Sequence, residues 1–213
     1  MSGNRIKNVR HKNLHVLVWS HENVERITKL IQVSNVPAIK LFFEKYGIAQ
    51  VLDILYGVNG NVEELFQILS NIVVNVFLET HTISSMLDIL RSMDGNVEKL
   101  FQCLSNSNVI VFIETHGIPN MLGILYDVNG NVVKLFQILS NRYVMVFIKI
   151  RSISSMLDIL RCVNGNVSKL FQILSNRTAM FFIKTRSISG MLEILRSVNG
   201  NATKLIQILS NMF

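Results

Sequence analysis

One block of sequence recurs along this chain at intervals of 35 residues. A glycine within the tetrapeptide V-N-G-N, or a close variant of it, stands at Gly60, Gly95, Gly130, Gly165 and Gly200. The residues that follow are nearly copied, from GNVEELFQILSN to GNVSKLFQILSN. A period of roughly 20–50 residues is the signature of repeat proteins, in which each unit buries its apolar face against its neighbours. The chain is therefore predicted to be an array of stacked units.

A degenerate copy precedes the five clear ones. Phe42 lies 35 residues before Phe77, but Glu25 stands where the glycine is expected. Terminal units of a repeat array are usually atypical because one of their faces has no neighbour. We therefore predict two regions: residues 1–47, a basic N-terminal segment with a degenerate capping repeat, and residues 48–213, five tandem repeats with the last one truncated.

Two helices are predicted within each unit. In the last copy, Ile188, Met191, Leu192 and Leu195 follow the three- and four-residue spacing of an amphipathic helix. Asn-Gly or Asp-Gly then ends this helix, because these residue types tolerate left-handed dihedrals. An asparagine able to cap a helix follows each glycine and opens the second helix, whose buried stripe is the L-F-Q-I-L text.

The last third of each unit, such as YVMVFIKI after Arg142, is rich in β-branched residues and has the propensity of a strand. A strand needs a pairing partner in every repeat, whereas a longer second helix needs none. We therefore favour a long second helix that bends at the Ser-Asn pair in its middle. The predicted fold is all-α, a right-handed superhelical α-solenoid of two-helix repeats of 35 residues each.

Charge is unevenly distributed in this basic chain, whose net charge is +7. Residues 1–12 carry +4 and residues 141–213 carry +8, while the segment between them carries −5. Clustered cations favour a polyanionic partner, and we rank nucleic acid above a generic basic surface. No long apolar run or secretory signal is present, so no membrane association is expected. Cys103 and Cys162 lack a C-x-x-C partner, which favours a reducing, intracellular location.

Catalysis has little support in the sequence. There is no phosphate-binding glycine loop, H-E-x-x-H or C-x-x-C motif, and the histidines do not converge with carboxylates or cysteines at one repeat position. His81 and His116 are equivalent, but Arg151 and Arg186 replace them in the next copies, which favours a solvated helix end. We expect no enzymatic activity, no cofactor and no metal site.

The turn between the two predicted helices is the most informative place. One polar residue precedes each glycine, at Asn59, Asp94, Asn129, Asn164 and Asn199, which we call the reading residues. In a stack of repeats these turns line up, beside helix N-termini whose free N–H groups suit phosphates. The alternative interpretation is that Asn-Gly is only a turn signature, chosen for its left-handed dihedrals.

With VNGNVVKL as its turn, the repeat resembles the transcription activator-like effector (TALE-like) repeats of bacterial plant pathogens. That family also has units of 33–35 residues, a variable base-reading residue just before a glycine and a longer, bent second helix. The text THGI at Thr115–Ile118 is similar to the joint between the family's repeats. The resemblance covers residues 48–213 in layout.

The resemblance implies a monomer that binds double-stranded DNA and contacts one base pair per repeat. The asparagines would each meet a purine, with guanine preferred, and Asp94 a cytosine, so that the target is G-C-G-G-G; this agrees with major-groove chemistry. Arg5, Lys7, Arg10 and Lys12 would contact DNA without reading its sequence. The implied location is the bacterial cytoplasm or, after delivery, a host cell nucleus. The residues expected to bind phosphate are Gly60, Asn61, Gly95, Asn96, Lys99, Gly130, Asn131, Lys134, Gly165, Asn166, Lys169, Gly200, Asn201 and Lys204.

The chain departs from the family pattern at three positions. Valine or methionine, such as Val163, precedes the reading residue where the family usually has a bracing His or Asn. Asparagine replaces the family's second glycine, and a residue such as Val167 replaces its phosphate-contacting lysine, the nearest lysine being Lys169. The side chains that brace the loop and contact phosphate in the family are therefore absent from their usual positions here.

Two other functions fit a helical repeat. Pentatricopeptide repeats are also 35 residues long and resemble the stretch GNVEKLF; they bind single-stranded RNA through the first helix, which would make Ser84, Asn120 and Ser155 the important positions. The first helix fits their pattern poorly, with Asp158 and Arg161 at expected apolar sites. A protein-binding scaffold similar to tetratricopeptide arrays is a third possibility, although variation between copies falls mainly in the tail of the second helix.

Overall fold

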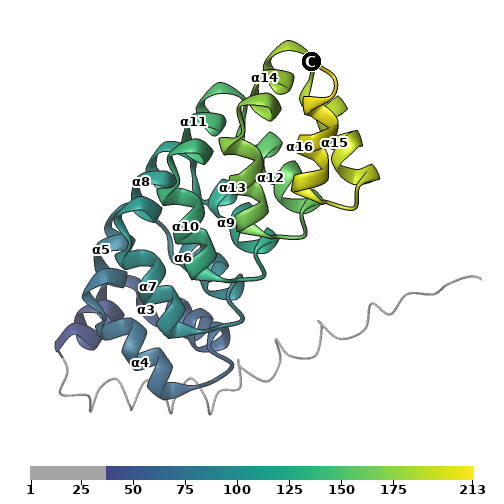
Figure 1. Cartoon of the computed structure of the whole chain (residues 1–213). Coiled ribbons are helices and arrows are strands. Elements are labelled where there is room, and N and C mark those ends of the chain that lie inside the picture. Colours follow the sequence, from purple (N-terminus) through teal and green to yellow (C-terminus); the bar gives the residue numbers. More distant parts are fainter. Residues whose placement is uncertain (1–36) are drawn as a thin grey trace, which may run out of the picture. The chain divides into compact units, whose positions relative to one another are not determined.

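A computed structural model describes residues 37–213 of the chain (Figure 1). Every regular element in this range is an α-helix, and the range contains no β-strand. The predicted all-α class is confirmed, and the β-branched segments are helical. Arg5, Lys7, Arg10 and Lys12, predicted to contact DNA, lie outside the described residues.

The chain forms two compact units. The described part of the first unit comprises residues 37–91 and 95–97, with α3 (Pro37–Gly57), α4 (Val62–Ser70), α5 (Ile72–Thr80) and α6 (Ile83–Arg91). The second unit comprises residues 92–94 and 98–213. Its helices are α7 (Val97–Ser105), α8 (Ser107–His116), α9 (Ile118–Asp127), α10 (Val132–Ser140), α11 (Arg142–Ile150), α12 (Ile153–Cys162), α13 (Val167–Ser175), α14 (Arg177–Thr185), α15 (Ile188–Ser197) and α16 (Ala202–Ser210).

Each complete repeat among the described residues contains three short helices, and the truncated last one contains two, α15 and α16, so the prediction of two helices per 35-residue repeat is wrong. The predicted long second helix is divided at an asparagine that recurs at Asn71, Asn106, Asn141 and Asn176. Asn71 has extended dihedrals, φ −77° and ψ 122°, and its side chain accepts hydrogen bonds from the N–H groups of Val73 and Val74. The asparagine therefore caps a new helix instead of bending the old one.

Gly47 divides α3 in a different way. Its φ of 76° and ψ of 175° are not helical, so α3 consists of two helices that meet at this residue. The second of them, which ends at Gly57, corresponds to α6 in the next repeat. A residue with positive φ lies in the region that glycine adopts without steric cost, which explains why glycine stands at this joint.

The core is built from the same apolar positions in each copy. In α13, Leu170, Ile173 and Leu174 are buried, and α13 packs against α14 and α16 within the second unit. Among residues 37–213, no polar or charged residue is buried. No helix in this range is long and apolar enough to span a bilayer.

Candidate nucleic-acid interface

The turns that carry the reading residues share one backbone conformation. Asn164 has a φ of 53° and Gly165 a φ of 66°, and the Gly165 N–H donates to the Leu160 carbonyl at 2.9 Å. Two successive left-handed residues thus end α12, which accounts for the choice of Asn or Asp followed by Gly. All five reading residues have a φ of 53–57°, and all five side chains are exposed. The side chains are therefore accessible as well as conformationally required.

A buried valine anchors the turn from below. Val163, which directly precedes Asn164, is 2% exposed, and its N–H donates to the Ile159 carbonyl at 3.1 Å. Val128 is buried in the same way before Asn129. The position where the TALE-like family has a bracing polar side chain is therefore filled here by a core residue. Packing, and not a side-chain hydrogen bond, holds the turn.

Successive turns in the second unit touch each other. A Cβ atom added to Gly130 would lie 2.7 Å from the carbonyl oxygen of Ser92, which belongs to the preceding turn. Cβ atoms added to Gly165 and Gly200 would overlap the carbonyl oxygens of Asp127 and Cys162 in the same way. Within this unit the turns thus form a contiguous row, and the glycines are needed for the close approach as well as for their positive φ.

The asparagines predicted to bind phosphate act as helix caps. Asn131, Asn166 and Asn201 each accept a hydrogen bond at 3.0 Å from the N–H group three residues ahead. In the first unit, Asn61 accepts from the N–H groups of Glu63 and Glu64. An anion at these helix ends would therefore bind the N–H groups that the cap leaves free. For the remaining N–H groups it would compete with the amide oxygen of the capping asparagine.

One of the predicted phosphate-binding lysines contacts the turn of the next repeat. Lys134 extends to the next turn, where its Nζ atom donates to the Gly165 carbonyl at 3.4 Å. Lys99 and Lys169 are half-buried, and Lys204 is exposed. The contact of Lys134 links successive repeats and leaves its ammonium group beside the row of turns.

An open pocket of about 450 Å³ lies along this row in the second unit. It brings together two successive reading residues, Asn164 and Asn199, with two guanidinium groups, Arg161 and Arg196. The remaining lining residues are Asp158, Cys162 and Gly200. The pocket therefore combines amide groups suited to hydrogen bonding with positive charge.

The sequence analysis missed the two arginines of this pocket. Each lies three residues before a reading residue, in the last turn of the helix that leads to it. This repeat position holds a planar side chain in every full copy: Tyr56, Arg91, Tyr126, Arg161 and Arg196. That recurrence was the available signal. Tyr126 is 80% exposed, so its ring lies open to solvent beside Asn129.

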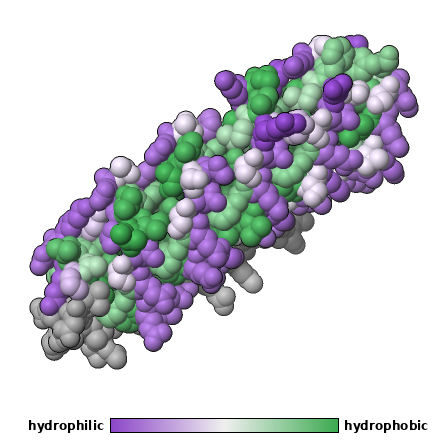
Figure 2. All heavy atoms as spheres, turned by 60° about the vertical axis from the view of Figure 1, so that its left-hand side comes forward, coloured by the Kyte–Doolittle hydropathy of each residue, from purple (hydrophilic) through white to green (hydrophobic). Residues whose placement is uncertain are grey.

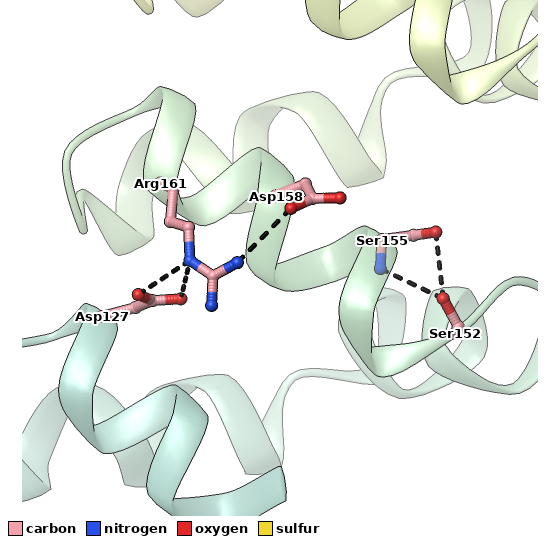
Figure 3. Close-up of polar contacts among 5 residues, drawn as sticks. All are labelled: Asp127, Ser152, Ser155, Asp158 and Arg161. Carbon is pink, nitrogen blue, oxygen red and sulfur yellow. Dashed lines mark hydrogen bonds and ion pairs between the residues drawn. The ribbon is translucent and has the colours of Figure 1, made fainter.

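Arg161 is held by carboxylates from two repeats (Figure 3). Its Nε atom lies 3.0 Å from Oδ2 of Asp127, and its Nη1 atom lies 3.4 Å from Oδ1 of Asp158. The Asp127 side chain is only 4% exposed. Arg196 has no ion-pair partner within residues 37–213. The positive charge of the pocket therefore comes mainly from Arg196, while Arg161 is oriented by its acidic partners.

The residues of the pentatricopeptide interpretation have local structural roles. The Ser155 N–H donates to Oγ of Ser152, which caps α12 (Figure 3). Asn120 Nδ2 donates to the His116 carbonyl at 2.6 Å, and Ser84 is exposed. These contacts place Asn120 and Ser155 in the first turns of their helices and not beside the pocket.

The repeat position that holds His81 and His116 also makes contacts that stabilise the fold. The His81 ring stacks on Phe77 at 4.3 Å between centroids. In equivalent copies, the Tyr46 hydroxyl donates to the Leu78 carbonyl, and Arg151 Nη2 donates to the Ile183 carbonyl. His81, Arg151 and Arg186 all stand at helix ends, as predicted, and in the Tyr46 and Arg151 copies the side chain also contacts the third helix of the next repeat. Within residues 37–213 no group of three His, Cys, Asp or Glu side chains converges as a metal site.

Comparison of the chain with protein-family models, curated proteins and solved structures found no match.

Proposed function

We propose that this chain binds double-stranded DNA along its row of turns, with one base pair contacted per repeat. The proposal places the repeats in a right-handed superhelix that follows the DNA groove. The observation that carries it is the pocket in which Asn164 and Asn199, both exposed, lie beside Arg196. The helix bounds that recur every 35 residues and the turn-to-turn contacts of the second unit supply the regular spacing such a reader needs.

The chemistry of the reading residues favours base contacts in the major groove. An asparagine amide donates to the N7 atom of a purine, and an aspartate accepts from the cytosine amine. The expected target therefore remains G-C-G-G-G, with Asp94 at the cytosine. Arg196 and the lysines beside the turns would contact phosphates, which give affinity without sequence preference. In this proposal the protein acts as a monomer inside a cell, needs no cofactor and catalyses no reaction.

Single-stranded RNA is a second candidate ligand, and Tyr126 is the observation that favours it. Its exposed ring, like the guanidinium planes of Arg161 and Arg196 at the equivalent positions, offers a flat surface beside a reading residue. Aromatic rings and guanidinium planes stack on the unpaired bases of single strands. Duplex DNA would gain nothing from such stacking, so Tyr126→Ala separates the two ligands.

Fluorescence anisotropy with the full chain tests the proposal. We expect low-micromolar or weaker binding to duplex DNA, in line with non-specific baselines of about 10⁻⁴–10⁻⁶ M, and a steep loss of affinity as salt rises. Labelled single-stranded RNA of the same sequence serves as the competing ligand. Affinity that is equal at low and high salt for both ligands would contradict nucleic-acid binding altogether.

Two substitutions separate a base contact from a turn requirement. Asn164→Gly keeps the left-handed dihedrals but removes the amide, so stability should be retained while affinity for the G-C-G-G-G duplex falls by up to about tenfold, because one hydrogen bond to a purine N7 is lost. Asp94→Asn should shift preference at one base pair only. Unchanged affinity of Asn164→Gly would mean that the asparagine serves the turn alone, and a uniform loss at all positions for Asp94→Asn would contradict one-base-per-repeat contact.

A further inference from the structure

The second unit has a surface that the proposed function does not use. It lies on α11 and α14, the third helices of two successive repeats. In each helix one exposed apolar residue stands between two cations: Val146 between Arg142 and Lys149, and Phe181 between Arg177 and Lys184. Val146 is 54% exposed and Phe181 is 51% exposed. We call these six residues the cationic apolar face.

Helix geometry places the three residues of each helix together. Positions i, i+4 and i+7 lie on one side of an α-helix, and 142, 146 and 149 have this spacing, as do 177, 181 and 184. Neither α11 (RYVMVFIKI) nor α14 (RTAMFFIKT) contains an acidic residue. The face is therefore uniformly positive at its borders and apolar along its middle.

The two helices are joined directly. Arg151, which caps the C-terminal end of α11, donates from Nη2 to the Ile183 carbonyl of α14 at 2.6 Å. Both helices also pack against α13. Figure 2, which turns the side of α11 and α14 towards the viewer, shows apolar patches bordered by hydrophilic residues there. The two copies of the motif thus belong to one fixed surface.

An apolar side chain already occupies part of this surface. The Phe213 ring lies edge-on to Phe181, at 5.0 Å between centroids, and 6.3 Å from Phe182. Edge-to-face contacts at this distance are favourable for aromatic rings. The face therefore accepts an apolar group that comes from outside its own helices.

We propose that the cationic apolar face docks an acidic amphipathic helix of a partner protein. Such a helix presents apolar residues in one stripe and Asp or Glu beside it, which complements both features of the face. A nucleic acid would use the cations but leave Val146 and Phe181 uncovered. A membrane surface requires apolar side chains that project into the lipid, whereas half of Phe181 and nearly half of Val146 is covered by neighbours.

The chain itself supplies a matched control. On α8, Val111 occupies the repeat position of Val146 and Phe181 and is 56% exposed, but Glu114 stands where they have Lys149 and Lys184. Ser107 stands where they have arginine. An acidic partner should therefore avoid α8. The proposal does not depend on DNA binding, because the cationic apolar face lies on α11 and α14 and not on the turns. The whole of α13 separates the turn at Asn164 from Asn176, where α14 begins.

The test uses the full chain and a synthetic helical peptide with leucine at every third or fourth position and glutamate on both sides of that stripe. Peptides of the same composition in scrambled order, vesicles of phosphatidylserine and phosphatidylcholine, and a random-sequence DNA duplex are the competing probes. Binding is measured by fluorescence anisotropy or by vesicle co-sedimentation. We expect the ordered peptide to bind more tightly than the scrambled one, and to bind less tightly at high salt.

Substitutions test whether the peptide binds at the cationic apolar face. Phe181→Ser, and separately Lys149→Glu with Lys184→Glu, should each weaken peptide binding by about tenfold or more, as is typical for central interface residues, while Val111→Ser leaves it unchanged. Circular dichroism checks that each variant is folded, and the charge reversals test the face even where Phe181→Ser unfolds the chain. Asn164→Gly should bind the peptide normally, so failure of DNA binding is distinguishable from failure of this proposal. Any of three results would overturn the proposal. The scrambled peptide binds as tightly as the ordered one, or vesicles or DNA bind more tightly than the peptide and lose that binding in Phe181→Ser. The third is that Val111→Ser weakens peptide binding as much as Phe181→Ser does.

Discussion

The two compact units are built from the same repeat but carry opposite charge. The described part of the first unit has three Lys or Arg against six Asp or Glu, a net charge of −3, whereas the second unit has twelve against six, a net charge of +6. Their turns are nevertheless alike, with a φ of 54° at Asn59 and 53° at Asn164. The residues that shape the backbone are common to both units, while the exposed positions differ.

This difference indicates where an anionic ligand would bind. The open pocket and the cationic apolar face both lie in the second unit. Two equivalent positions in the first unit lack the cation: Glu79 is the counterpart of Lys149, and Tyr56 that of Arg161, while Arg91 keeps the arginine of the second copy. Repetition therefore fixes the scaffold, while the charge on its exposed positions differs between the two units.

The largest effect is expected from a comparison of two turn glycines, Gly165 in the second unit and Gly60 in the first. In Gly165→Ala the turn would hold alanine in a left-handed dihedral, and its Cβ atom would overlap the backbone carbonyl of Asp127. We therefore expect a loss of about 3 kcal/mol or more in the free energy of unfolding. Gly60→Ala meets no described atom within 4 Å and should lose only about 1 kcal/mol, from its dihedral alone. Urea denaturation measures both. Equal losses would show that the turns do not pack against each other.

The second effect concerns one core position that differs between the units. Cys103 stands where Ile68 stands in the first unit, and burial raises the pKa of its thiol from 9.0 to about 12. Because folding raises this pKa, the thiol contributes fully to the free energy of unfolding below pH 9. That contribution is lost as the pH rises towards 12, at up to about 1.4 kcal/mol per pH unit. Thermal melts between pH 8 and 11 should show this decline.

Cys103→Ile is the control for that decline, because isoleucine fills the same position in the other copies. The variant should remove the part of the alkaline loss that belongs to the thiol. In the native chain at neutral pH, a thiol reagent should modify the half-buried Cys162 well before the buried Cys103. Equal rates for the two thiols, or an unchanged alkaline decline in Cys103→Ile, would contradict the burial effect.

The smallest effect separates two arginines at one repeat position. Among the described residues, Arg91 of the first unit forms an ion pair with Asp88, and both side chains are about half exposed (51% and 49%), so Arg91→Ala should change stability by less than about 0.5 kcal/mol. Arg161→Ala leaves the nearly buried Asp127 carboxylate without its ion-pair partner and should cost about 1 kcal/mol. A double-mutant cycle with Asp127→Asn measures the coupling, and a coupling of zero would mean that this inter-repeat pair has no energetic role.

Much of the local structure was predictable from the sequence. The period of 35 is visible directly as recurring text, and the helical class, the Asn-Gly turn and the capping asparagines at Asn61 and its counterparts depend on residues within one or two helical turns of each other. The break at Asn71 was also encoded locally, because the capping residue that opens α4 recurs there and opens α5. It was interpreted as a bend because an apolar run continued past it and obscured the cap.

The sequence by itself thus determined the repeat, its helices and the left-handed turns, since capping and dihedral preferences act between neighbouring residues. Only the tertiary structure decided which residues of neighbouring repeats meet. Arg161 reaches Asp127 across 34 residues, Arg151 reaches Ile183 across 32, and Gly165 fits against the carbonyl of Asp127. Such contacts depend on how one repeat packs on the next, and that packing brings Asn164 and Asn199 into one pocket with Arg196.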